Sequence, residues 1–287
     1  MKVRETALAV TRKAAGHMAE RGIENARLDA ELLMAAVLGV SRLDLYLQFD
    51  RPLNEQELTT YREHVKRRLK REPLQYIVGH VQFREIELNV DRRVLIPRPE
   101  TEVLVGEVLT WAARHGAKRA IDLGTGSGAI ALSLAKEGAF EQVVATDVSR
   151  DALKVAYGNA DRLGLKDRIE WRHGSLWDVV RDGETFDVIV SNPPYVESTS
   201  ATHLQPEVAE WEPAQALFAG PDGLDILRQI VTGAPDRLNR PGLLAVEIGA
   251  GQADAVKEIA ERTGAFAAVQ AVRDLSGRDR IISAEKI

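Results

Sequence analysis

Short apolar runs alternate with stretches of helical periodicity from residue 118 to the end of the 287-residue chain. Such alternation predicts a mostly parallel β-sheet that is covered by helices on both faces. The last two apolar runs are separated by only residues 275–278, which is too short for a helical crossover, so these two strands should be antiparallel neighbours. The expected strands are residues 119–124, 142–148, 169–174, 186–191, 242–249, 268–274 and 279–285.

The first 72 residues have a different character, because apolar residues recur at helical spacing and no strand pattern appears. Gly39 should end one helix, and Asn54 with Glu57 forms a capping box that should begin another. Alternating apolar and polar residues from about residue 74 to residue 94 then indicate a hairpin. We predict a helical domain over residues 1–72, a linker with a β-hairpin over 73–97 and an α/β domain over 98–287.

A run with five Lys and Arg residues, at positions 64–71, closes the helical domain. At helical spacing Val65 and Leu69 should face inward, which leaves the charges as a solvated face. The alternative is a docking patch for a partner that is bound to RNA. Residues 1–75 carry 14 Lys and Arg against 11 Asp and Glu, whereas the rest of the chain carries 24 against 32, so the N-terminal part is the basic one.

Composition excludes several classes of site. The chain has no cysteine, so disulfides, thiolate metal sites and a thiol nucleophile are excluded. Its six histidines are scattered without metal-ligand spacing, and no Gly-x-Ser-x-Gly elbow follows a strand, so we expect neither a metal site nor a serine hydrolase. No apolar run reaches the length of a membrane span, and the net charge of −5 argues against a general nucleic-acid binder. We expect a cytoplasmic protein.

A glycine-rich loop, Asp122-Leu123-Gly124-Thr125-Gly126-Ser127-Gly128, joins the first strand of the sheet to a helix. The glycines permit a tight turn and let a ligand approach the backbone amides at the helix N-terminus. Asp147 ends the next strand, where its carboxylate can accept hydrogen bonds from both hydroxyls of a ribose. The loop alone leaves a nicotinamide cofactor and S-adenosylmethionine both open. Asp122 favours S-adenosylmethionine, because a carboxylate there can contact the amino-acid end of that cofactor, directly or through water, but would repel a pyrophosphate.

Trp177 follows the third strand of the sheet and should reach the same edge. Its indole suits stacking on an adenine, and it equally suits a place in the core. The residue types alone leave these two roles open.

The motif Asn192-Pro193-Pro194-Tyr195 follows a buried strand that ends at the ligand-binding edge of the sheet. The prolines keep the backbone extended and leave carbonyl groups free. Those carbonyls, a side-chain amide and a flat ring suit a planar NH₂ group, whose hydrogens need acceptors and whose face needs a stacking partner. The motif therefore predicts a site for an amide or an exocyclic amine, and the alternative is a turn that merely ends a strand.

Further motifs occur in a fixed order along the chain: Pro73-Leu74-Gln75-Tyr76-Ile77-Val78-Gly79, Leu95-Ile96-Pro97-Arg98-Pro99-Glu100-Thr101-Glu102, Trp211-Glu212-Pro213, and Glu247-Ile248-Gly249 with Gln252. Together with the glycine-rich loop and the Asn-Pro-Pro-Tyr motif, they make essentially the whole chain resemble the PrmC/HemK family, the N5-glutamine methyltransferases of peptide chain release factors. The resemblance implies the class I S-adenosylmethionine-dependent methyltransferase fold: α/β, with a seven-stranded, mostly parallel sheet whose last strand is antiparallel, and a small N-terminal helical bundle.

The resemblance also implies roles for individual residues. S-adenosylmethionine, the methyl donor that leaves as S-adenosylhomocysteine, would be bound by Gly124, Thr125, Gly126, Ser127, Gly128, Asp147, Trp177 and Asn192. The substrate would be bound by Asn192, Pro193, Pro194 and Tyr195, of which Asn192, Pro193 and Tyr195 would be catalytic. That substrate is the glutamine of the Gly-Gly-Gln motif in bacterial class 1 release factors. A separate hypothesis is that the helical domain docks the body of the release factor while the catalytic α/β domain takes its loop, and we expect a monomer.

Three other functions compete with this interpretation. A nucleic-acid methyltransferase acting on the exocyclic amine of adenine (N6) or guanine (N2) uses the same Asn-Pro-Pro-Tyr motif, but it needs a basic surface, and residues 76–287 are acidic. A non-catalytic S-adenosylmethionine-binding protein would be expected to carry a damaged motif, and this one is intact. An oxidoreductase is favoured less than either. A steep loss of substrate affinity with added salt would indicate the nucleic-acid enzyme.

Overall fold

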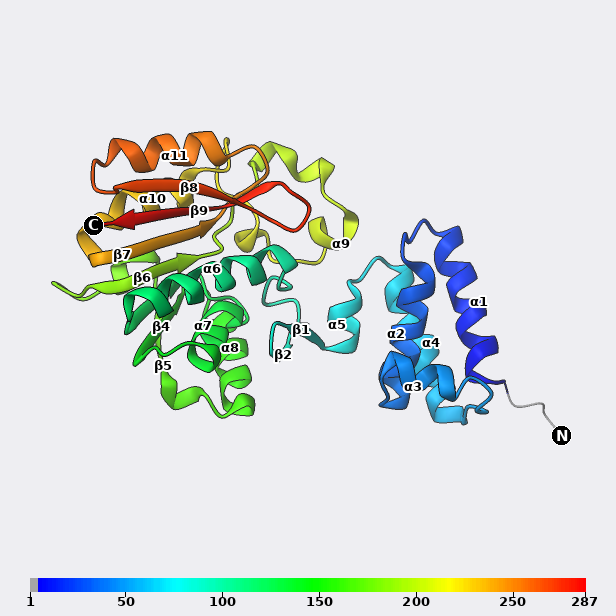
Figure 1. The fold of residues 1–287 in the computed structure, drawn as a ribbon. Coiled ribbons are helices and arrows are strands. Elements are labelled where there is room, and N and C mark those ends of the chain that lie inside the picture. The colour runs from blue at the N-terminus through cyan, green and yellow to red at the C-terminus, as the bar shows by residue number, and fades with distance from the viewer. Residues whose placement is uncertain (1–4) are drawn as a thin grey trace. The chain divides into compact units, whose positions relative to one another are not determined.

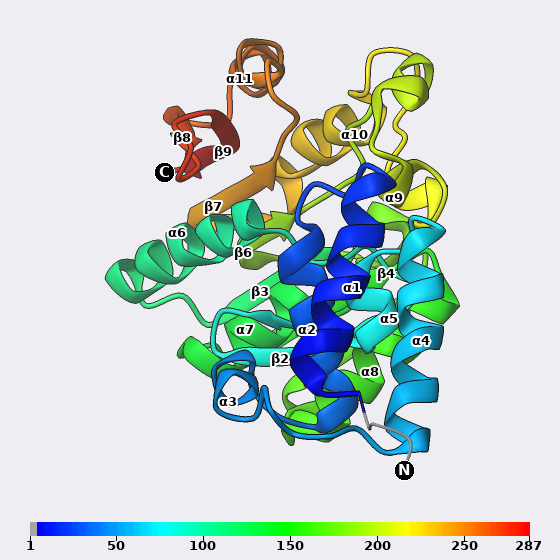
Figure 2. The same cartoon turned by 90° about the vertical axis from the view of Figure 1, so that its right-hand side faces the viewer.

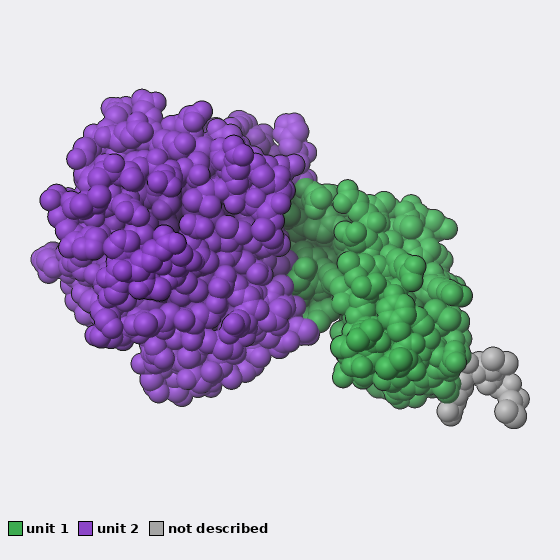
Figure 3. Space-filling view, in the orientation of Figure 1, with its two compact units in different colours: residues 1–79, 205–211 green, residues 80–204, 212–287 purple. Residues whose placement is uncertain are grey.

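The computed structural model describes residues 5–287, which divide into two compact units. The helical unit comprises the chain up to residue 79 together with residues 205–211, and the α/β unit comprises residues 80–204 and 212–287 (Figure 3). The first four residues of the predicted helical domain lie outside the described residues. Residues 205–211 thus belong to the helical unit, although the chain on both sides of them belongs to the α/β unit.

Among the described residues the helical unit has six helices, and α1 to α5 contribute side chains to one apolar core (Figure 1). Gly39 ends the second helix with a left-handed φ of 64°, and the side chains of Asn54 and Glu57 form the capping box that begins the fourth, as the sequence predicts. The helices are α1 (Ala7–Glu20), α2 (Ala26–Leu38), α3 (Arg42–Leu47), α4 (Glu55–Leu69), α5 (Leu74–Val78) and α9 (Pro206–Ala209).

Part of the predicted hairpin is a helix instead. Residues 74–78 form α5, and the hairpin comes one segment later, as β1 (His80–Phe83) and β2 (Ile86–Asn89). Tyr76 and Ile77 are both buried although they are adjacent, which suits a helix and not a strand with one exposed face. Gly79 ends α5 with a φ of 91°, so this glycine is a helix cap and not the turn between two strands.

The basic run at the end of α4 is not uniformly solvated. Arg68 is only 7% exposed, and it donates hydrogen bonds to Asp29 of α2 (2.7 Å) and to Glu207 of α9 (2.9 Å). Arg71 forms a second ion pair with Glu207, at 3.0 Å. The expectation that every charge of this run faces water is therefore wrong for Arg68, because two carboxylates compensate its burial.

The α/β unit contains a seven-stranded sheet in the order β5-β4-β3-β6-β7-β9-β8 (Figures 1 and 2). The last strand in sequence, β9, pairs antiparallel with both of its neighbours, and the other pairings are parallel, which confirms the predicted fold. The strands are β3 (Arg119–Leu123), β4 (Gln142–Asp147), β5 (Ile169–His173), β6 (Phe186–Ser191), β7 (Leu238–Glu247), β8 (Ala268–Arg273) and β9 (Asp279–Lys286).

Helices cover both faces of this sheet. Helices α6 (Pro99–His115), α7 (Ala129–Glu137) and α8 (Arg150–Leu163) pack on one face, and α10 (Asp225–Gly233) and α11 (Ala253–Arg262) pack on the other. In β3, Ala120 points to the first core and Ile121 to the second, as the two-residue period of a strand requires. The short 3₁₀ helices are η1 (Lys166–Arg168), η2 (Leu176–Val179), η3 (Ser198–His203), η4 (Ala214–Ala216) and η5 (Pro235–Arg237). Within residues 5–287, no helix has the length and apolar character needed to cross a membrane.

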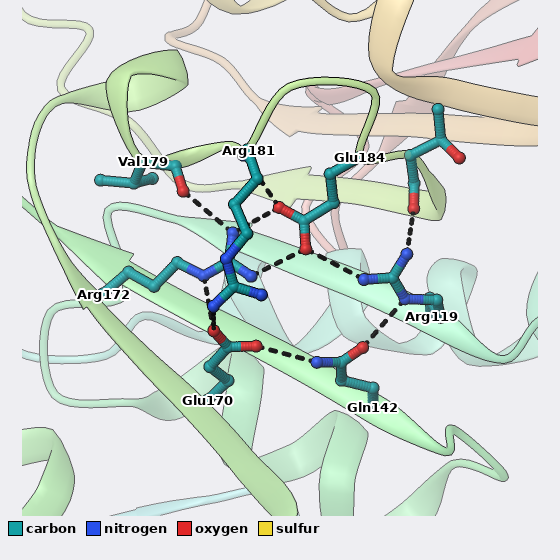
Figure 4. Close-up of polar contacts among 8 residues, drawn as sticks. Arg119, Gln142, Glu170, Arg172, Val179, Arg181 and Glu184 are labelled. Carbon is teal, nitrogen blue, oxygen red and sulfur yellow. Dashed lines mark hydrogen bonds and ion pairs between the residues drawn. The ribbon is translucent and has the colours of Figure 1, made fainter.

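An ion-pair network joins β5 to the first residue of β3 and to the loop that precedes β6 (Figure 4). Arg172 of β5 donates to both carboxylate oxygens of Glu184 (2.5 and 2.7 Å), and Arg119 of β3 donates to the same carboxylate (3.0 Å). The side chains of Arg172 and Glu184 are only 9% and 7% exposed. The hydrogen bond from Arg172 lowers the pKa of Glu184 to about 2.

Glu184→Ala should lower the free energy of unfolding by ~3–5 kcal/mol, because it leaves the buried guanidinium of Arg172 without its main partner. Urea unfolding at pH 7 would measure this loss. Arg181→Ala removes the exposed ion pair with Glu170 in the same network and should lower the free energy of unfolding by ~1 kcal/mol or less. Equal effects of the two substitutions would show that the Arg172–Glu184 pair contributes no more than a surface contact.

The same pair makes stability depend on pH in a stated direction. Because the folded-state pKa of Glu184 lies below its ordinary value of 4.5, the contribution is fully present above that value and is lost as the pH falls toward 2. In the Glu184→Ala variant this part of the acid dependence should be absent.

Candidate active site

A cavity of about 360 Å³ opens at the carboxyl edge of the parallel strands, entirely within the α/β unit. The loops that follow β3, β4, β5 and β6 all line it, because the carboxyl ends of parallel strands meet at one edge of a sheet. Residues 93–95 and 97, which precede α6, line it as well, together with Thr101, Ile226 and residues from the segment 213–218. The cavity lies where the glycine-rich loop and the Asn-Pro-Pro-Tyr motif approach each other.

The glycine-rich loop forms one end of this cavity. Gly124, Thr125, Gly126 and Ser127 line it, whereas Gly128 does not and instead caps α7. A Cβ atom on Gly128 would lie 2.8 Å from the Leu132 side chain, and φ is 87° there, so only glycine begins this helix without strain. The amides of Gly124 and Thr125 both donate to the carbonyl of Thr146 (3.0 and 2.8 Å), which fixes the loop against β4.

Asp147, at the end of β4, lies in the cavity wall beside the loop. Its carboxylate accepts hydrogen bonds from the amides of Gly126 (2.9 Å) and Ser149 (2.8 Å). Burial raises the pKa of Asp147, and these two hydrogen bonds oppose the rise. An ionised carboxylate has about four acceptor positions, so two are left for hydroxyl groups of a ligand.

Asp122 is fully buried and does not line the cavity. Its Oδ2 accepts hydrogen bonds from the hydroxyl of Thr125 (2.6 Å) and the amide of Ala131 (3.2 Å), while Oδ1 has no hydrogen-bond partner within the described part of the chain. Burial raises the pKa of Asp122 to about 7. The side chain therefore holds the loop and the start of α7, and of the two contacts predicted for it, direct or through water, this geometry does not support the direct one.

Trp177 does not line the cavity, and its neighbour Leu176 does. The Trp177 indole donates to the carbonyl of Gln229 in α10 (2.9 Å) and lies 4.8 Å from the guanidinium of Arg237. A Cβ atom on Gly233 would collide with the ring, so the indole fills a space that this glycine leaves. This placement is at odds with the cofactor role predicted for Trp177, and it agrees with the role in packing that the sequence left open.

Three residues of the Asn-Pro-Pro-Tyr motif line the cavity: Asn192, Pro193 and Pro194. Tyr195 does not, because its hydroxyl turns to Glu247 (3.2 Å). Its backbone carbonyl accepts a hydrogen bond from the side chain of Gln252 (3.0 Å). Burial is the main cause that raises the pKa of Tyr195, so the phenol keeps its proton. The structure thus brings Asn192, Pro193 and Pro194 to the glycine-rich loop and turns the tyrosine ring away.

Thr101 and Glu247, which had no predicted role, are connected to the side chain of Asn192 by hydrogen bonds. The side-chain amide of Asn192 donates to the hydroxyl of Thr101 (3.0 Å), and that hydroxyl donates to Glu247 (2.6 Å). Glu247 ends β7, next to the strand that precedes Asn192, and is 1% exposed. Burial raises the pKa of Glu247 to about 7, although the hydrogen bonds from Thr101 and Tyr195 oppose the rise.

Sequence comparisons with known proteins found two matching domain models and relatives over nearly the whole chain. Residues 9–79 match the PrmC N-terminal domain, and residues 100–210 match the methyltransferase small domain. A release factor glutamine methyltransferase from Geobacter sulfurreducens is 47% identical to this chain, covering 93% of this chain and 92% of that protein. Proteins of the same name from Rhodopirellula baltica and Chlorobaculum tepidum are 39% and 41% identical, covering 93% and 92% of this chain and 92% of each relative. The chain belongs to the release factor glutamine methyltransferase family.

Solved structures show the same fold at lower identity. A methyltransferase from Pyrococcus furiosus is similar with a TM-score of 0.52 at 20% identity, covering 69% of this chain and 88% of that one. The hMettl16 catalytic domain in complex with the MAT2A 3'UTR hairpin 6 is similar with a TM-score of 0.55 at 17% identity, covering 69% of this chain and 74% of that one. As a member of the release factor glutamine methyltransferase family, the protein is a methyltransferase enzyme.

Thr101 and Glu247 stand in two motifs by which the chain resembles this family, but neither was predicted to have a role in the site. A signal was present for Glu247, since it is an ionisable residue directly after the apolar run of β7. The rule that places Asp147 at the ligand-binding edge of the sheet places Glu247 there as well. For Thr101 no comparable signal exists, because a threonine in the first turn of a helix is ordinary.

Proposed function

We propose that this protein transfers a methyl group from S-adenosylmethionine to the side-chain amide nitrogen of the glutamine in the Gly-Gly-Gln motif of peptide chain release factors. The observation that carries the proposal is the near-full-length similarity to proteins named release factor glutamine methyltransferase, up to 47% identical over 93% of the chain. The intact Asn-Pro-Pro motif in the wall of the cavity supports the choice of a planar amide as the acceptor. A cytoplasmic monomer is the form in which we propose that it acts.

The glycine-rich end of the cavity fits S-adenosylmethionine. Asp147 offers acceptor positions for the two ribose hydroxyls, and the backbone from Gly124 to Ser127 leaves room for the amino-acid end. Leu176 and Ile226 provide apolar surface for the adenine, in place of the stack predicted for Trp177. When bound there, S-adenosylmethionine supplies an electrophilic methyl group.

The other end of the cavity suits the glutamine side chain. The side-chain oxygen of Asn192 and the carbonyl of Pro193 can each accept one hydrogen of the substrate amide. An amide nitrogen is a poor nucleophile because its lone pair is delocalised into the carbonyl group. Holding both hydrogens on acceptors orients the nitrogen and favours the pyramidal, charge-developing geometry of the transition state. A strong base before transfer is unnecessary, since the nitrogen becomes acidic once it is methylated.

Transfer of labelled methyl from S-adenosylmethionine to a purified bacterial release factor tests the proposal directly. A release factor in which the glutamine of the Gly-Gly-Gln motif is replaced serves as the matched control, and total RNA and DNA serve as competing acceptors. We expect label on the intact release factor alone. Label on nucleic acid with the release factor unmarked, lost steeply as salt is added, would instead assign the pocket to a nucleic-acid amine.

We further propose that the helical unit docks the body of the release factor while the cavity receives its loop. The core of the helical unit shares no residue with the two cores of the α/β unit, so removal of residues 1–72 should leave the sheet and its helices folded. The deletion should raise the KM for the release factor at least about tenfold and leave the Kd of S-adenosylmethionine unchanged, because the cavity lies in the α/β unit. A folded truncated protein, verified by circular dichroism, with an unchanged KM would exclude this docking role.

A further inference from the structure

Glu247 is a buried carboxyl group that forms no salt bridge within residues 5–287. The charged groups that face it are Glu100 from α6, which raises its pKa, and Arg280 from β9, which lowers it. Arg280 is itself paired with Asp274, at 3.5 Å. Burying a carboxylate without a counter-ion is costly, so its hydrogen-bond donors become decisive.

Two hydroxyl groups supply those donors. An ionised carboxylate only accepts hydrogen bonds, so the hydroxyl of Tyr195 donates to Oε1 and that of Thr101 donates to Oε2. At 2.6 Å the bond from Thr101 has the length of a charge-assisted hydrogen bond. Both ends of the Asn-Pro-Pro-Tyr motif are thereby connected to one carboxylate, Tyr195 directly and Asn192 through Thr101.

The orientation of Asn192 follows from a count of hydrogens. A threonine hydroxyl has one hydrogen, and Thr101 gives it to Glu247. Toward Asn192 the hydroxyl oxygen can then only accept, so the atom that faces it at 3.0 Å must be Nδ2. The side-chain oxygen of Asn192 is consequently the atom left for a ligand in the cavity.

We propose that Glu247 is a positioning residue that acts through the hydroxyl of Thr101 to hold the Asn192 side chain with its oxygen, and not its NH₂ group, toward the acceptor amine. This inference rests on the proposed function, and it adds two residues to the site that neither touch the reacting atoms nor belong to the Asn-Pro-Pro-Tyr motif. The methyl-accepting group that this orientation selects is an NH₂ group with two hydrogens to donate. A ligand that presents a hydrogen-bond acceptor to the Asn192 oxygen would be rejected.

Protonation of Glu247 removes this constraint. A protonated carboxyl can donate to Thr101, whose own hydrogen then turns toward Asn192 and allows the amide to flip. The NH₂ group of Asn192 would then face the NH₂ group of the substrate, and because both groups are hydrogen-bond donors, no hydrogen bond would form between them. Burial brings the pKa of Glu247 to about 7, so the ionised, active form is present above that pH and is lost below it. We therefore expect kcat to fall as the pH decreases through about 7.

The test measures kcat, the KM for both substrates and the pH profile for the full-length protein, Glu247→Gln and Thr101→Val. Thr101→Val should lower kcat about 10²-fold with the Kd of S-adenosylmethionine unchanged. Glu247→Gln should cost less, because the glutamine amide can face Thr101 with either its oxygen or its NH₂ group, and both variants should lose the decrease in kcat below pH 7. The double variant should be no worse than Thr101→Val, because that substitution already breaks the connection. Thr101→Ser should recover most of the activity that Thr101→Val loses, and Thr110→Val, on an exposed position of the same helix, should have no effect.

Two results would overturn the inference: an unchanged kcat in Thr101→Val, which alters no charge, or a decrease below pH 7 that persists in Glu247→Gln. If Glu247→Gln is poorly folded, the comparison of Thr101→Val with Thr101→Ser decides alone. Failure of the proposed function looks different, since the unsubstituted protein would then leave the release factor unlabelled. In that case the same variants are measured with the acceptor that does become labelled.

Discussion

Asn192→Ala should lower kcat for methyl transfer at least about 10²-fold while the Kd of S-adenosylmethionine changes less than twofold. Asn192 carries the side-chain oxygen that we expect to accept a hydrogen of the substrate amide, and the loss of one such preorganised group typically costs 10²–10³ in rate. Cofactor contacts come mainly from Asp147 and the glycine-rich loop, at the other end of the cavity. Single-turnover transfer of labelled methyl and calorimetric titration with S-adenosylhomocysteine would measure the two quantities.

An isosteric replacement sharpens this prediction. In Asn192→Asp a carboxylate oxygen would face the hydroxyl of Thr101, whose only hydrogen is already given to Glu247. The two oxygens would repel each other, so we expect a loss of kcat similar to that of Asn192→Ala although size is conserved. Asn239→Ala, which removes an amide paired with Asp187 at the opposite edge of the sheet, is the matched control and should leave kcat unchanged. A Kd for S-adenosylhomocysteine that rises as much as kcat falls would show that Asn192 serves the cofactor and not the acceptor.

The sheet could be predicted from the sequence because buried strands carry a local signal. Six of the seven strands begin at the predicted residue, and β7 begins four residues early, at Leu238, where no continuous apolar run marks its start. The reversal of β9 followed from a connection too short for a crossover. At residues 74–78 the same reasoning failed, because an alternating pattern over five residues fits one turn of helix as well as a strand.

The direction in which side chains point was the main property of the site that could not be predicted from the sequence. Leu176 has a left-handed φ of 42°, and it lines the cavity while the adjacent Trp177 contacts α10. No pattern in the sequence indicates which of two neighbouring side chains faces a ligand. Tyr195 likewise turns to Glu247, a partner 52 residues away whose position depends on the pairing of β6 with β7.

Ion pairs between residues far apart in the sequence could not be predicted either. Arg68 looks like one cation in an exposed basic run, and its burial depends on Asp29 and on Glu207, which is 139 residues away in sequence. No local sequence pattern indicates that residues 205–211 leave the α/β unit and join the helical unit. Pairing partners at such separations are set by tertiary structure, which periodicity and composition do not encode.

Asp147→Ala should weaken binding of S-adenosylhomocysteine about 10²-fold, the largest effect on cofactor affinity that we expect from one side chain. Each hydrogen bond from a ribose hydroxyl to a carboxylate contributes ~1.5–3 kcal/mol, so the loss of even one corresponds to roughly 10- to 150-fold in Kd. The substitution also removes the acceptor for the amides of Gly126 and Ser149, which position the loop. Calorimetric titration of the purified protein would give the Kd directly.

Asp147→Asn separates the two contributions in that prediction. Asparagine keeps one oxygen acceptor of the same size but loses the second one and the charge, so its Kd should fall between those of the unsubstituted protein and Asp147→Ala. Because burial raises the pKa of Asp147, affinity for S-adenosylhomocysteine should also decrease as the pH falls and the carboxylate is protonated, and Asp147→Asn should lack that dependence. Asp161→Ala is the matched control: it removes an exposed carboxylate in α8 that pairs with Lys166, and it should leave the Kd of S-adenosylhomocysteine unchanged. If Asp147→Ala binds S-adenosylhomocysteine as tightly as the unsubstituted protein, the ribose lies elsewhere and the orientation proposed for the cofactor in this cavity is wrong.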